Sequence, residues 1–228
     1  MLVFVVAGGE LPEPQRFAPF ARAANLVIAA DAGYDHLLAM GARPHLLIGD
    51  LDSISPTALA DARRAAVPME TFPTEKDCTD TELVLREAVR RGATCVLACG
   101  TFGDRLDHTL ANVLLLASPA LRETDVRLLD ARQEVRLVRG SVQLRTQPGE
   151  TISLLPVGGE VRGVTTTGLY YPLSDATLQT GPALGISNVA VGEDVAVRAA
   201  SGALLITRIF TGGLDATQYL RDLVAPSP

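Results

Sequence analysis

Two aspartates, Asp50 and Asp52, follow an apolar run and are separated by one residue. The run His45–Ile48 has the composition of a short buried strand, and Gly49 comes directly after it. If the strand continued, alternate residues would point to the same side, so both carboxylates would face one point in space. Two negative charges that close need a cation, a shared proton or a net of strong hydrogen bonds. The spacing therefore indicates a metal site.

The same segment is also typical of a turn from a strand into a helix. Ser55 suits a helix N-cap, Pro56 suits the first helical position, and aspartates are common turn residues. The segment alone favours neither interpretation, so the polar residues elsewhere decide between them.

Further polar residues follow the other predicted strands in the first half of the chain. After Leu2–Ala7, Leu26–Ala30, Met69–Phe72 and Thr94–Cys99 come Gly8, Gly9, Asp31, Lys76, Asp77, Thr79, Asp80, Gly103, Asp104, Arg105 and Asp107. In an open α/β sheet, ligands bind beyond the carboxyl ends of the strands. Carboxylates gathered there with the basic side chains of Lys76 and Arg105 and several glycines indicate Mg²⁺ and a polyphosphate. Lys76 is the only lysine among the 20 basic residues, and lysine and arginine are not interchangeable at a phosphate.

Each of these residues also has a structural explanation. The segment Thr79-Asp-Thr-Glu82 matches a capping box, in which Thr79 and Glu82 only start a helix. Asp107 would be a helix N-cap in the same way, with His108 and Asn112 as surface or packing residues of that helix. The joint placement of these residues at one edge of a sheet, rather than any single residue, argues for a site.

The first half of the chain alternates strand and helix patterns. Helical spacing occurs at Pro14–Ala24, Tyr34–Met40, Thr57–Ala66, Asp80–Arg91 and Asp107–Ala117, and a last strand is expected at Val126–Leu129. Such alternation with short loops predicts a parallel sheet with helices on both faces.

The pattern changes after about Arg132, where short β runs are divided by Gly, Pro and Asp. These runs are Val135–Val138, Val142–Leu144, Thr151–Leu155, Val161–Thr166, Val195–Ala199 and Ala203–Ile209. They predict a small antiparallel sandwich or barrel. We therefore expect an α/β domain over residues 1–131 and an all-β domain over residues 132–228.

Composition narrows the class of protein. The 228 residues are 47% hydrophobic, which suffices for a core, and the net charge of −6 without a basic run gives no sign of a nucleic-acid partner. Three cysteines without CxxC spacing fit reduced thiols. The first residues lack the basic region of a signal peptide, and no apolar run approaches the ~20 residues of a membrane span. A cytoplasmic protein is expected.

Taken together, the motifs resemble those of thiamine pyrophosphokinase. The resemblance rests on Asp31-Ala-Gly33, Gly49-Asp50-Leu-Asp52-Ser53, Lys76-Asp77-Cys-Thr79-Asp80-Thr-Glu82, Gly103-Asp-Arg105-Leu-Asp107-His108 with Asn112, Thr165-Thr-Thr-Gly168-Leu-Tyr-Tyr-Pro172 and Gly185-Ile-Ser187-Asn188. These segments occur in the order of the family's motifs and span most of the chain. The resemblance implies a Rossmann-like catalytic α/β domain that binds ATP and Mg²⁺. It also implies a C-terminal β-sandwich that binds thiamine, and a homodimer with sites at the subunit interface.

Roles for single residues follow from the resemblance by position. The implied metal ligands are Asp50, Asp52 and Asp80, and the implied catalytic residues are Lys76, Asp80, Arg105 and Asp107. The implied ATP contacts are Asp31, Lys76, Asp77, Thr79, Gly103, Arg105 and His108. The implied thiamine contacts are Asp107, Asn112, Tyr170, Tyr171, Ser187 and Asn188. The implied reaction moves a diphosphoryl group from ATP to the hydroxyl of thiamine and releases AMP.

Two departures from the family pattern leave rival interpretations open. Ala32 and Asp104 stand where the family usually has glycine, and the chain contains no Trp to stack on thiamine. A diphosphokinase for another hydroxymethyl heterocycle, such as a pterin, would share the architecture. A sensor that binds thiamine or a nucleotide without catalysis would result if Asp104, with its negative charge near the phosphates, had spoiled the site.

Overall fold

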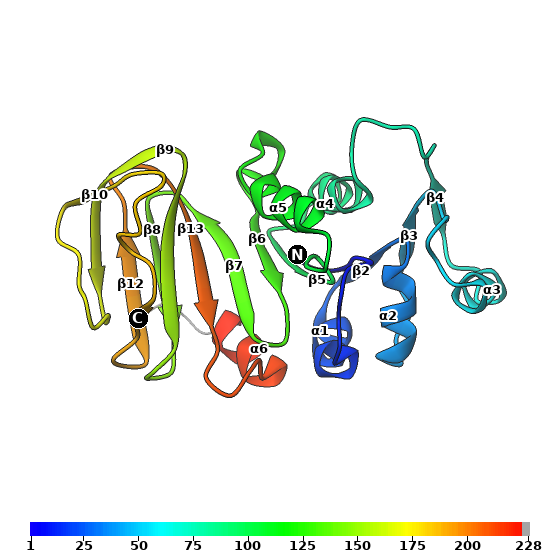
Figure 1. Ribbon diagram of the computed structural model, residues 1–228. Coiled ribbons are helices and arrows are strands. Elements are labelled where there is room, and N and C mark those ends of the chain that lie inside the picture. Colours follow the sequence, from blue (N-terminus) through cyan, green and yellow to red (C-terminus); the bar gives the residue numbers. More distant parts are fainter. Residues whose placement is uncertain (225–228) are drawn as a thin grey trace. The chain divides into compact units, whose positions relative to one another are not determined.

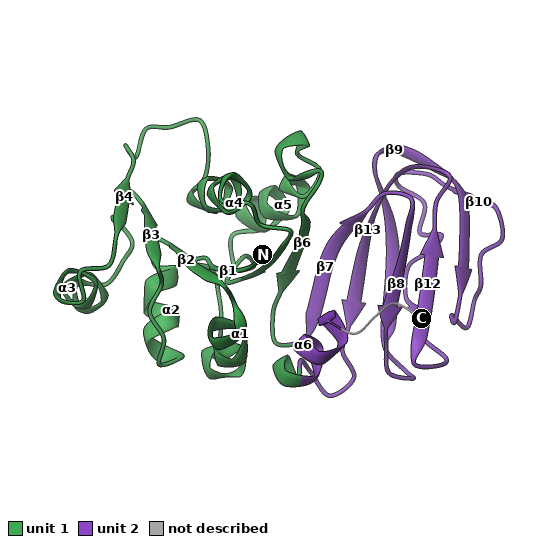
Figure 2. Ribbon diagram, turned by 180° about the vertical axis from the view of Figure 1, so that it is seen from behind, with its two compact units in different colours: residues 1–131, 215–217 green, residues 132–214, 218–228 purple. Residues whose placement is uncertain are grey.

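A computed structural model describes residues 1–224, which form two compact units. Unit 1 comprises residues 1–131 and 215–217, and unit 2 comprises residues 132–214 and the chain from residue 218 onward (Figure 2). Each unit is described by itself.

Unit 1 is built on six parallel strands in the order β4-β3-β2-β1-β5-β6. Their bounds are β1 Leu2–Val6, β2 Leu26–Ala30, β3 Leu46–Gly49, β4 Met69–Thr71, β5 Cys95–Cys99 and β6 Asp125–Leu129. The side chains of Val3–Val6 are fully buried, because a parallel sheet covered on both faces has no wet side. This explains why the strands read as continuous apolar runs.

Helices cover both faces of this sheet. Figure 1 shows α1 (Ala18–Ala23) and α2 (Gly33–Ala39) on one face and α4 (Asp80–Arg90) and α5 (Leu106–Leu115) on the other. The remaining helices of unit 1 are η1 (Pro14–Phe17), α3 (Pro56–Arg64) and η2 (Pro119–Leu121). The helix expected over residues 14–24 is thus divided, with a 3₁₀ turn before α1.

The strand order reverses beside β1, and this reversal creates the position for a ligand. Strands β2 to β4 lie on one side of β1, whereas β5 and β6 lie on the other, so the loops after β1 and β5 lead to opposite faces. Ligands bind at such a point in open sheets. Gly9 lies there, and a Cβ atom at Gly9 would collide with the carbonyl oxygens of Gly100 and Phe102. The glycine allows these loops to approach each other.

Unit 2 is rich in β-structure. Its strands are β7 Gln133–Val138, β8 Ser141–Arg145, β9 Thr151–Thr167, β10 Ala176–Leu178, β11 Asn188–Val189, β12 Asp194–Arg198 and β13 Ser201–Ile209. The order β7-β13-β9-β12-β8 is antiparallel throughout, and β10 and β11 pair with β9. One hydrophobic core, which includes Ile152, Val164, Val197 and Leu204, is shared by these strands.

Two features of unit 2 differ from the expectation. The two strands expected at 151–155 and 161–166 are parts of the single long strand β9, because Gly158 and Gly159 take positive φ angles of 76° and 137° and let the chain bend without ending the pairing. An all-β domain was expected to the end of the chain, but helix α6 spans Ala216–Val224. The Asp215 carboxylate accepts a hydrogen bond from the Thr217 N–H at 2.9 Å and so caps this helix.

A search of the described helices finds none that combines the length and the apolar character required to cross a bilayer. Residues 225–228 lie outside the described part of the chain.

Candidate active site

A cavity of about 520 Å³ opens at the carboxyl ends of the strands of unit 1. The loops after β1, β2, β3 and β5 line it, together with the segment before α4 and the first turns of α5. The lining residues that the sequence predicted are Gly8, Gly9, Asp31, Asp50, Lys76, Thr79, Asp80, Gly103, Arg105, His108 and Asn112. Unit 1 therefore brings most of the predicted polar residues to one place. Asp52, Asp77 and Asp107 are not among the lining residues.

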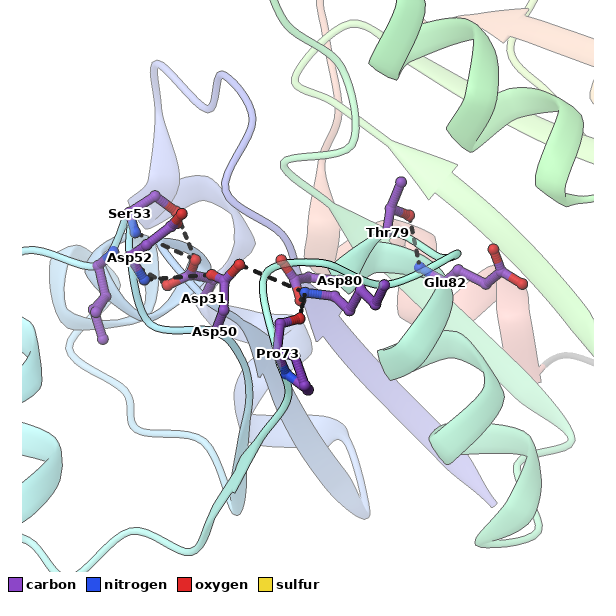
Figure 3. Close-up of polar contacts among 10 residues, drawn as sticks. Asp31, Asp50, Asp52, Ser53, Pro73, Thr79, Asp80 and Glu82 are labelled. Atoms are coloured by element: carbon purple, nitrogen blue, oxygen red, sulfur yellow. Dashed lines mark hydrogen bonds and ion pairs between the residues drawn. The ribbon is translucent and has the colours of Figure 1, made fainter.

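Three carboxylates form a tight cluster at this cavity. One oxygen each from Asp31, Asp50 and Asp52 lies within 4.8 Å of the others, and Figure 3 shows them beside Ser53. The expected closeness of Asp50 and Asp52 is confirmed, but the reason is different. Strand β3 ends at Gly49, and Leu51 has a φ of 64°, so a turn rather than the alternation of a strand brings the two side chains together.

Asp31 holds the turn that carries the other two aspartates. Its carboxylate accepts hydrogen bonds from the Ser53 hydroxyl at 2.8 Å and from the Ile54 N–H at 3.1 Å. Burial raises the pKa of Asp31, with a further contribution from the negative charge of Asp50, while the bonds from Ser53 oppose the shift. The carboxylate thus lies in a place where a cation would stabilise its ionised form.

The environments of Asp50 and Asp52 move their pKa values in opposite directions. Burial disfavours ionised Asp50, but the Asp52 N–H, the Thr74 hydroxyl and the Lys76 ammonium together hold its pKa below the usual value. The negative charge of Asp50 raises the pKa of Asp52, which is exposed. A cation between the two carboxylates would relieve their repulsion. Carboxylate oxygens are the donors that Mg²⁺ prefers, so this donor set fits the ion.

Lys76 lies between two carboxylates. Its Nζ is 3.2 Å from Asp80 Oδ1 and 3.6 Å from Asp50 Oδ2, and it donates a hydrogen bond to the Pro73 carbonyl. Burial favours the neutral amine, but the two aspartates outweigh it and the pKa of Lys76 is raised. Within residues 1–224, Asp80 is not part of the cluster of Asp31, Asp50 and Asp52, and Lys76 links it to Asp50 of that cluster.

Of the helix caps predicted at Thr79 and Asp107, the first is confirmed and the second is wrong. Thr79 is the N-cap of α4, and its hydroxyl accepts from the Glu82 N–H at 3.1 Å. Asp107 is not an N-cap, because α5 begins at Leu106. Asp107 instead pairs with Arg105 at 2.6 Å, and both side chains are about two-thirds exposed. That pairing holds the pKa of Asp107 below its usual value.

The loop between β5 and α5 is held from within α5. The Gly103 N–H donates to the Thr109 hydroxyl at 3.2 Å, and the buried amide of Asn112 donates to the Thr101 carbonyl at 2.8 Å. Arg105 and His108 remain exposed at the cavity. The exposed side chain of Arg105 thus lies at the cavity on a loop that these hydrogen bonds hold in place.

Sequence reasoning missed several lining residues. Glu10, Thr74, Cys78, Phe102 and Thr109 also line the cavity. All five lie within two residues of a predicted site residue or glycine, and that neighbourhood is the signal that would have found them.

The departures Ala32 and Asp104 both line the cavity. A Cβ at Gly8 would lie 3.0 Å from the Cβ of Ala32, so these neighbouring loops are closely packed there. Asp104 is exposed, and its negative charge adds to the effect of Asp107 in raising the pKa of Arg105.

The residues predicted to contact thiamine from the second half lie together in unit 2. Tyr170 and Tyr171 are both 65% exposed, with ring centroids 4.8 Å apart. Asn188 is buried, and its amide donates to the Tyr171 carbonyl at 2.6 Å and accepts from the Tyr171 N–H at 3.0 Å. Ser187 has a φ of 58° and is exposed next to it. Asn188 thus fixes the backbone that presents a tyrosine.

Comparisons with known proteins agree with these motifs. A family model described as "Thiamin pyrophosphokinase, catalytic domain" matches residues 17–128, and one described as "Thiamin pyrophosphokinase, vitamin B1 binding domain" matches residues 141–204. Thiamine pyrophosphokinase of Bacillus subtilis (strain 168) is 29% identical over 90% of this chain and 96% of its own length. Thiamine pyrophosphokinase 1 of Arabidopsis thaliana is 27% identical over 92% of this chain and 87% of its own.

Solved structures give the same result. The crystal structure of the Bacillus subtilis thiamine pyrophosphokinase covers 92% of this chain and 99% of its own, with a TM-score of 0.83 and 26% identity. That of thiamin pyrophosphokinase from Geobacillus thermodenitrificans covers 92% and 98%, with a TM-score of 0.79 and 28% identity. Motifs, cavity, matched segments and fold agree, and the chain belongs to the thiamine pyrophosphokinase family.

Proposed function

We propose that this protein is a thiamine pyrophosphokinase, which transfers the diphosphoryl group of ATP to the hydroxyl of thiamine and releases AMP. The observation that carries the proposal is the position of Lys76, 3.2 Å from Asp80 and 3.6 Å from Asp50, beside three clustered carboxylates. This constellation lies in the segment that matches the catalytic family model, and the same chain matches the vitamin B1 binding model.

The reaction requires that the highly charged phosphates be positioned and their charge neutralised. It does not require a strong nucleophile on the protein. Transfer at phosphorus depends mainly on alignment and on charge neutralisation. Mg²⁺, when bound, would supply positive charge to the phosphate oxygens. Asp50 and Asp52, with Asp31 beside them, would hold that ion, and Asp80 is the further ligand that the family resemblance implies.

Two basic residues are suited to the phosphates. The Lys76 ammonium is a compact charge in the cavity wall. Arg105, on the loop before α5, presents an exposed planar guanidinium. On ATP binding, Lys76 would exchange part of its contact with Asp50 and Asp80 for phosphate oxygens. Asp31, Asp77, Thr79, Gly103 and His108 are the other proposed ATP contacts.

A carboxylate is proposed to accept the proton of the thiamine hydroxyl. Asp80 and Asp107 are the candidates. Asp80 lines the cavity, whereas Asp107 does not line it and is paired with Arg105, so we favour Asp80. Thiamine itself would contact Asp107, Asn112, Ser187, Asn188, Tyr170 and Tyr171.

The organisation of the whole enzyme is part of the proposal. We infer a Rossmann-like catalytic domain over residues 1–131 and a β-sandwich over residues 132–228 that binds thiamine and forms the dimer. We further infer a homodimer with sites at the subunit interface, where a partner would cover Tyr170 and Tyr171, which are exposed in the single chain. The enzyme is proposed to act in the cytoplasm.

One assay tests the function and its rivals. The purified protein is incubated with ATP, Mg²⁺ and either thiamine or a hydroxymethyl pterin, and AMP is measured. We expect AMP only with thiamine. AMP release with the pterin alone would favour a diphosphokinase of different specificity. Thiamine binding without AMP release would favour a sensor.

A further inference from the structure

The turn that carries Asp50 and Asp52 is strained and has to be held in place. Leu51 has a φ of 64°, in the left-handed region that a branched side chain seldom adopts. Such a conformation persists only where surrounding contacts determine it. The contacts that hold this turn therefore decide where the two carboxylates lie.

Two carboxylates hold the segment after Asp52, one from the turn before α2 and one from the first turn of α2. Asp31 accepts from the Ser53 hydroxyl and from the Ile54 N–H, as described above. Asp35, in the first turn of α2, accepts from the Ser55 N–H at 3.0 Å and makes a second, short hydrogen bond with the Ser55 hydroxyl. Ser55 in turn caps α3 by accepting from the Ala58 N–H at 3.1 Å.

The two carboxylates differ in what else they do. Asp31 lines the cavity and belongs to the cluster with Asp50 and Asp52. An ion bound there would compete with Ser53 and Ile54 for the oxygens of Asp31. Asp35 is outside the cluster and does not line the cavity, so both of its hydrogen bonds to Ser55 persist when an ion is bound.

We propose that Asp35 is a positioning residue that fixes the Asp50–Asp52 turn for metal binding through its two hydrogen bonds to Ser55. It joins the helix that follows β2 to the helix that follows β3, across the loop that carries the carboxylates. Partners that orient metal ligands commonly change metal affinity by about 10- to 100-fold when they are lost. This inference rests on the proposed function only in assigning the bound ion a role in catalysis.

The test measures Mn²⁺ binding directly, by electron paramagnetic resonance of the free ion, with and without ATP and without thiamine. We expect Asp35→Ala to raise the dissociation constant for Mn²⁺ by about tenfold or more. Asp35→Asn keeps one accepting oxygen and should recover part of the affinity. In the turnover assay, a high Mg²⁺ concentration should restore the kcat of Asp35→Ala.

A matched control separates positioning from folding. Asp61 is also a carboxylate that joins α2 to α3, but it binds Tyr34, Arg43 and Arg64 rather than the turn. Asp61→Asn should lower the melting temperature and leave the Mn²⁺ dissociation constant unchanged. If it fails to fold, Glu87→Gln on α4, whose carboxylate binds Arg90 and Arg91, takes its place.

Wild-type Mn²⁺ affinity in Asp35→Ala would overturn the proposal, as would an equal loss of affinity in the control variant. If the wild type itself binds no Mn²⁺ at millimolar concentrations in either condition, there is no metal for the turn to hold and the proposal is also overturned. The function is judged separately by thiamine-dependent AMP release. Either inference can therefore fail while the other stands.

Discussion

Lys76 Nζ lies 3.2 Å from Asp80 Oδ1, one helical turn ahead of it in the chain, at the point where α4 begins. The same ammonium is 3.6 Å from Asp50 on the loop after β3. One lysine thus joins the two acidic segments that border the cavity. With the phosphates of ATP in the cavity, this charge would lie where negative charge is greatest.

Replacing Lys76 should therefore remove activity with little change in fold. We expect Lys76→Ala to lower kcat/KM for AMP formation by about 100-fold or more, because one preorganised charge is lost at the transferring group. Lys76→Arg should recover only part, since a planar fork does not replace a compact ammonium.

Arg86→Ala is the control, because Arg86 is a cation on α4, the helix that Asp80 begins. Arg86 pairs with Glu82 and does not line the cavity. Its activity should equal that of the wild type. Wild-type activity in Lys76→Arg would show that any positive charge suffices there.

The second prediction concerns the proposed metal ligands. Asp52→Asn removes one of the three clustered carboxylates while keeping its size. AMP formation in Mg²⁺ should fall by about 100-fold, and thiamine binding measured by calorimetry should change much less. Glu75→Gln, an exposed acid outside the cluster and the cavity lining, should be neutral. Near-normal turnover in Asp52→Asn would remove Asp52 from the metal site.

The third prediction concerns Asn188 in unit 2. Its amide makes two hydrogen bonds to the backbone of Tyr171. Asn188→Ala removes both and should lower the free energy of unfolding by about 1–3 kcal/mol. If the presented tyrosine contacts thiamine, KM for thiamine should rise while KM for ATP stays constant.

Asn25→Ala provides the comparison for that variant. Asn25 likewise accepts from a backbone N–H, that of Leu2 at 2.8 Å, but it belongs to unit 1. It should lose stability without a change in KM for thiamine. Equal KM values in the two variants would argue against a thiamine role for Tyr171.

The fourth prediction is the pH dependence of stability. Hydrogen bonds from Arg43, then Arg64 and Tyr34, hold the pKa of Asp61 well below its ordinary value, against the effect of burial. Because the folded state favours the ionised form, this stabilisation is present above the ordinary pKa of about 3.9 and is lost as the pH falls through the lower folded-state pKa. Wild type should thus exceed Asp61→Asn in stability most near neutral pH.

Urea unfolding at neutral pH and at a series of acidic pH values checks this. The difference in free energy of unfolding between the two proteins should shrink below about pH 4. A difference that stays constant or grows on acidification would contradict the assignment of the ionised form to Asp61.

The sequence predicted the elements of unit 1 well because apolar runs and caps are local signals. Ser55 and Thr79 cap α3 and α4 as their spacing indicates, with their hydroxyls accepting from Ala58 and Glu82. The prediction of Asp107 as a cap was wrong because α5 begins one residue earlier, at Leu106.

The geometry of the site was less predictable, since it depends on contacts between distant segments. The metal set implied by the resemblance was Asp50, Asp52 and Asp80, whereas the clustered carboxylates are Asp31, Asp50 and Asp52. Asp80 lies outside that cluster and pairs with Lys76, which also contacts Asp50. The role of Asp35 has no sequence signal, because it depends on the packing of α2 beside Ser55.

The proposed reaction transfers an intact diphosphoryl group to thiamine, and ATP labelled at a single phosphate distinguishes this transfer from others. ATP carrying label at the β-phosphate, or separately at the γ-phosphate, is incubated with the protein, Mg²⁺ and thiamine. We expect both labels in thiamine diphosphate, with one AMP formed per product. Thiamine monophosphate with ADP, or no thiamine-dependent transfer of either label, would contradict it.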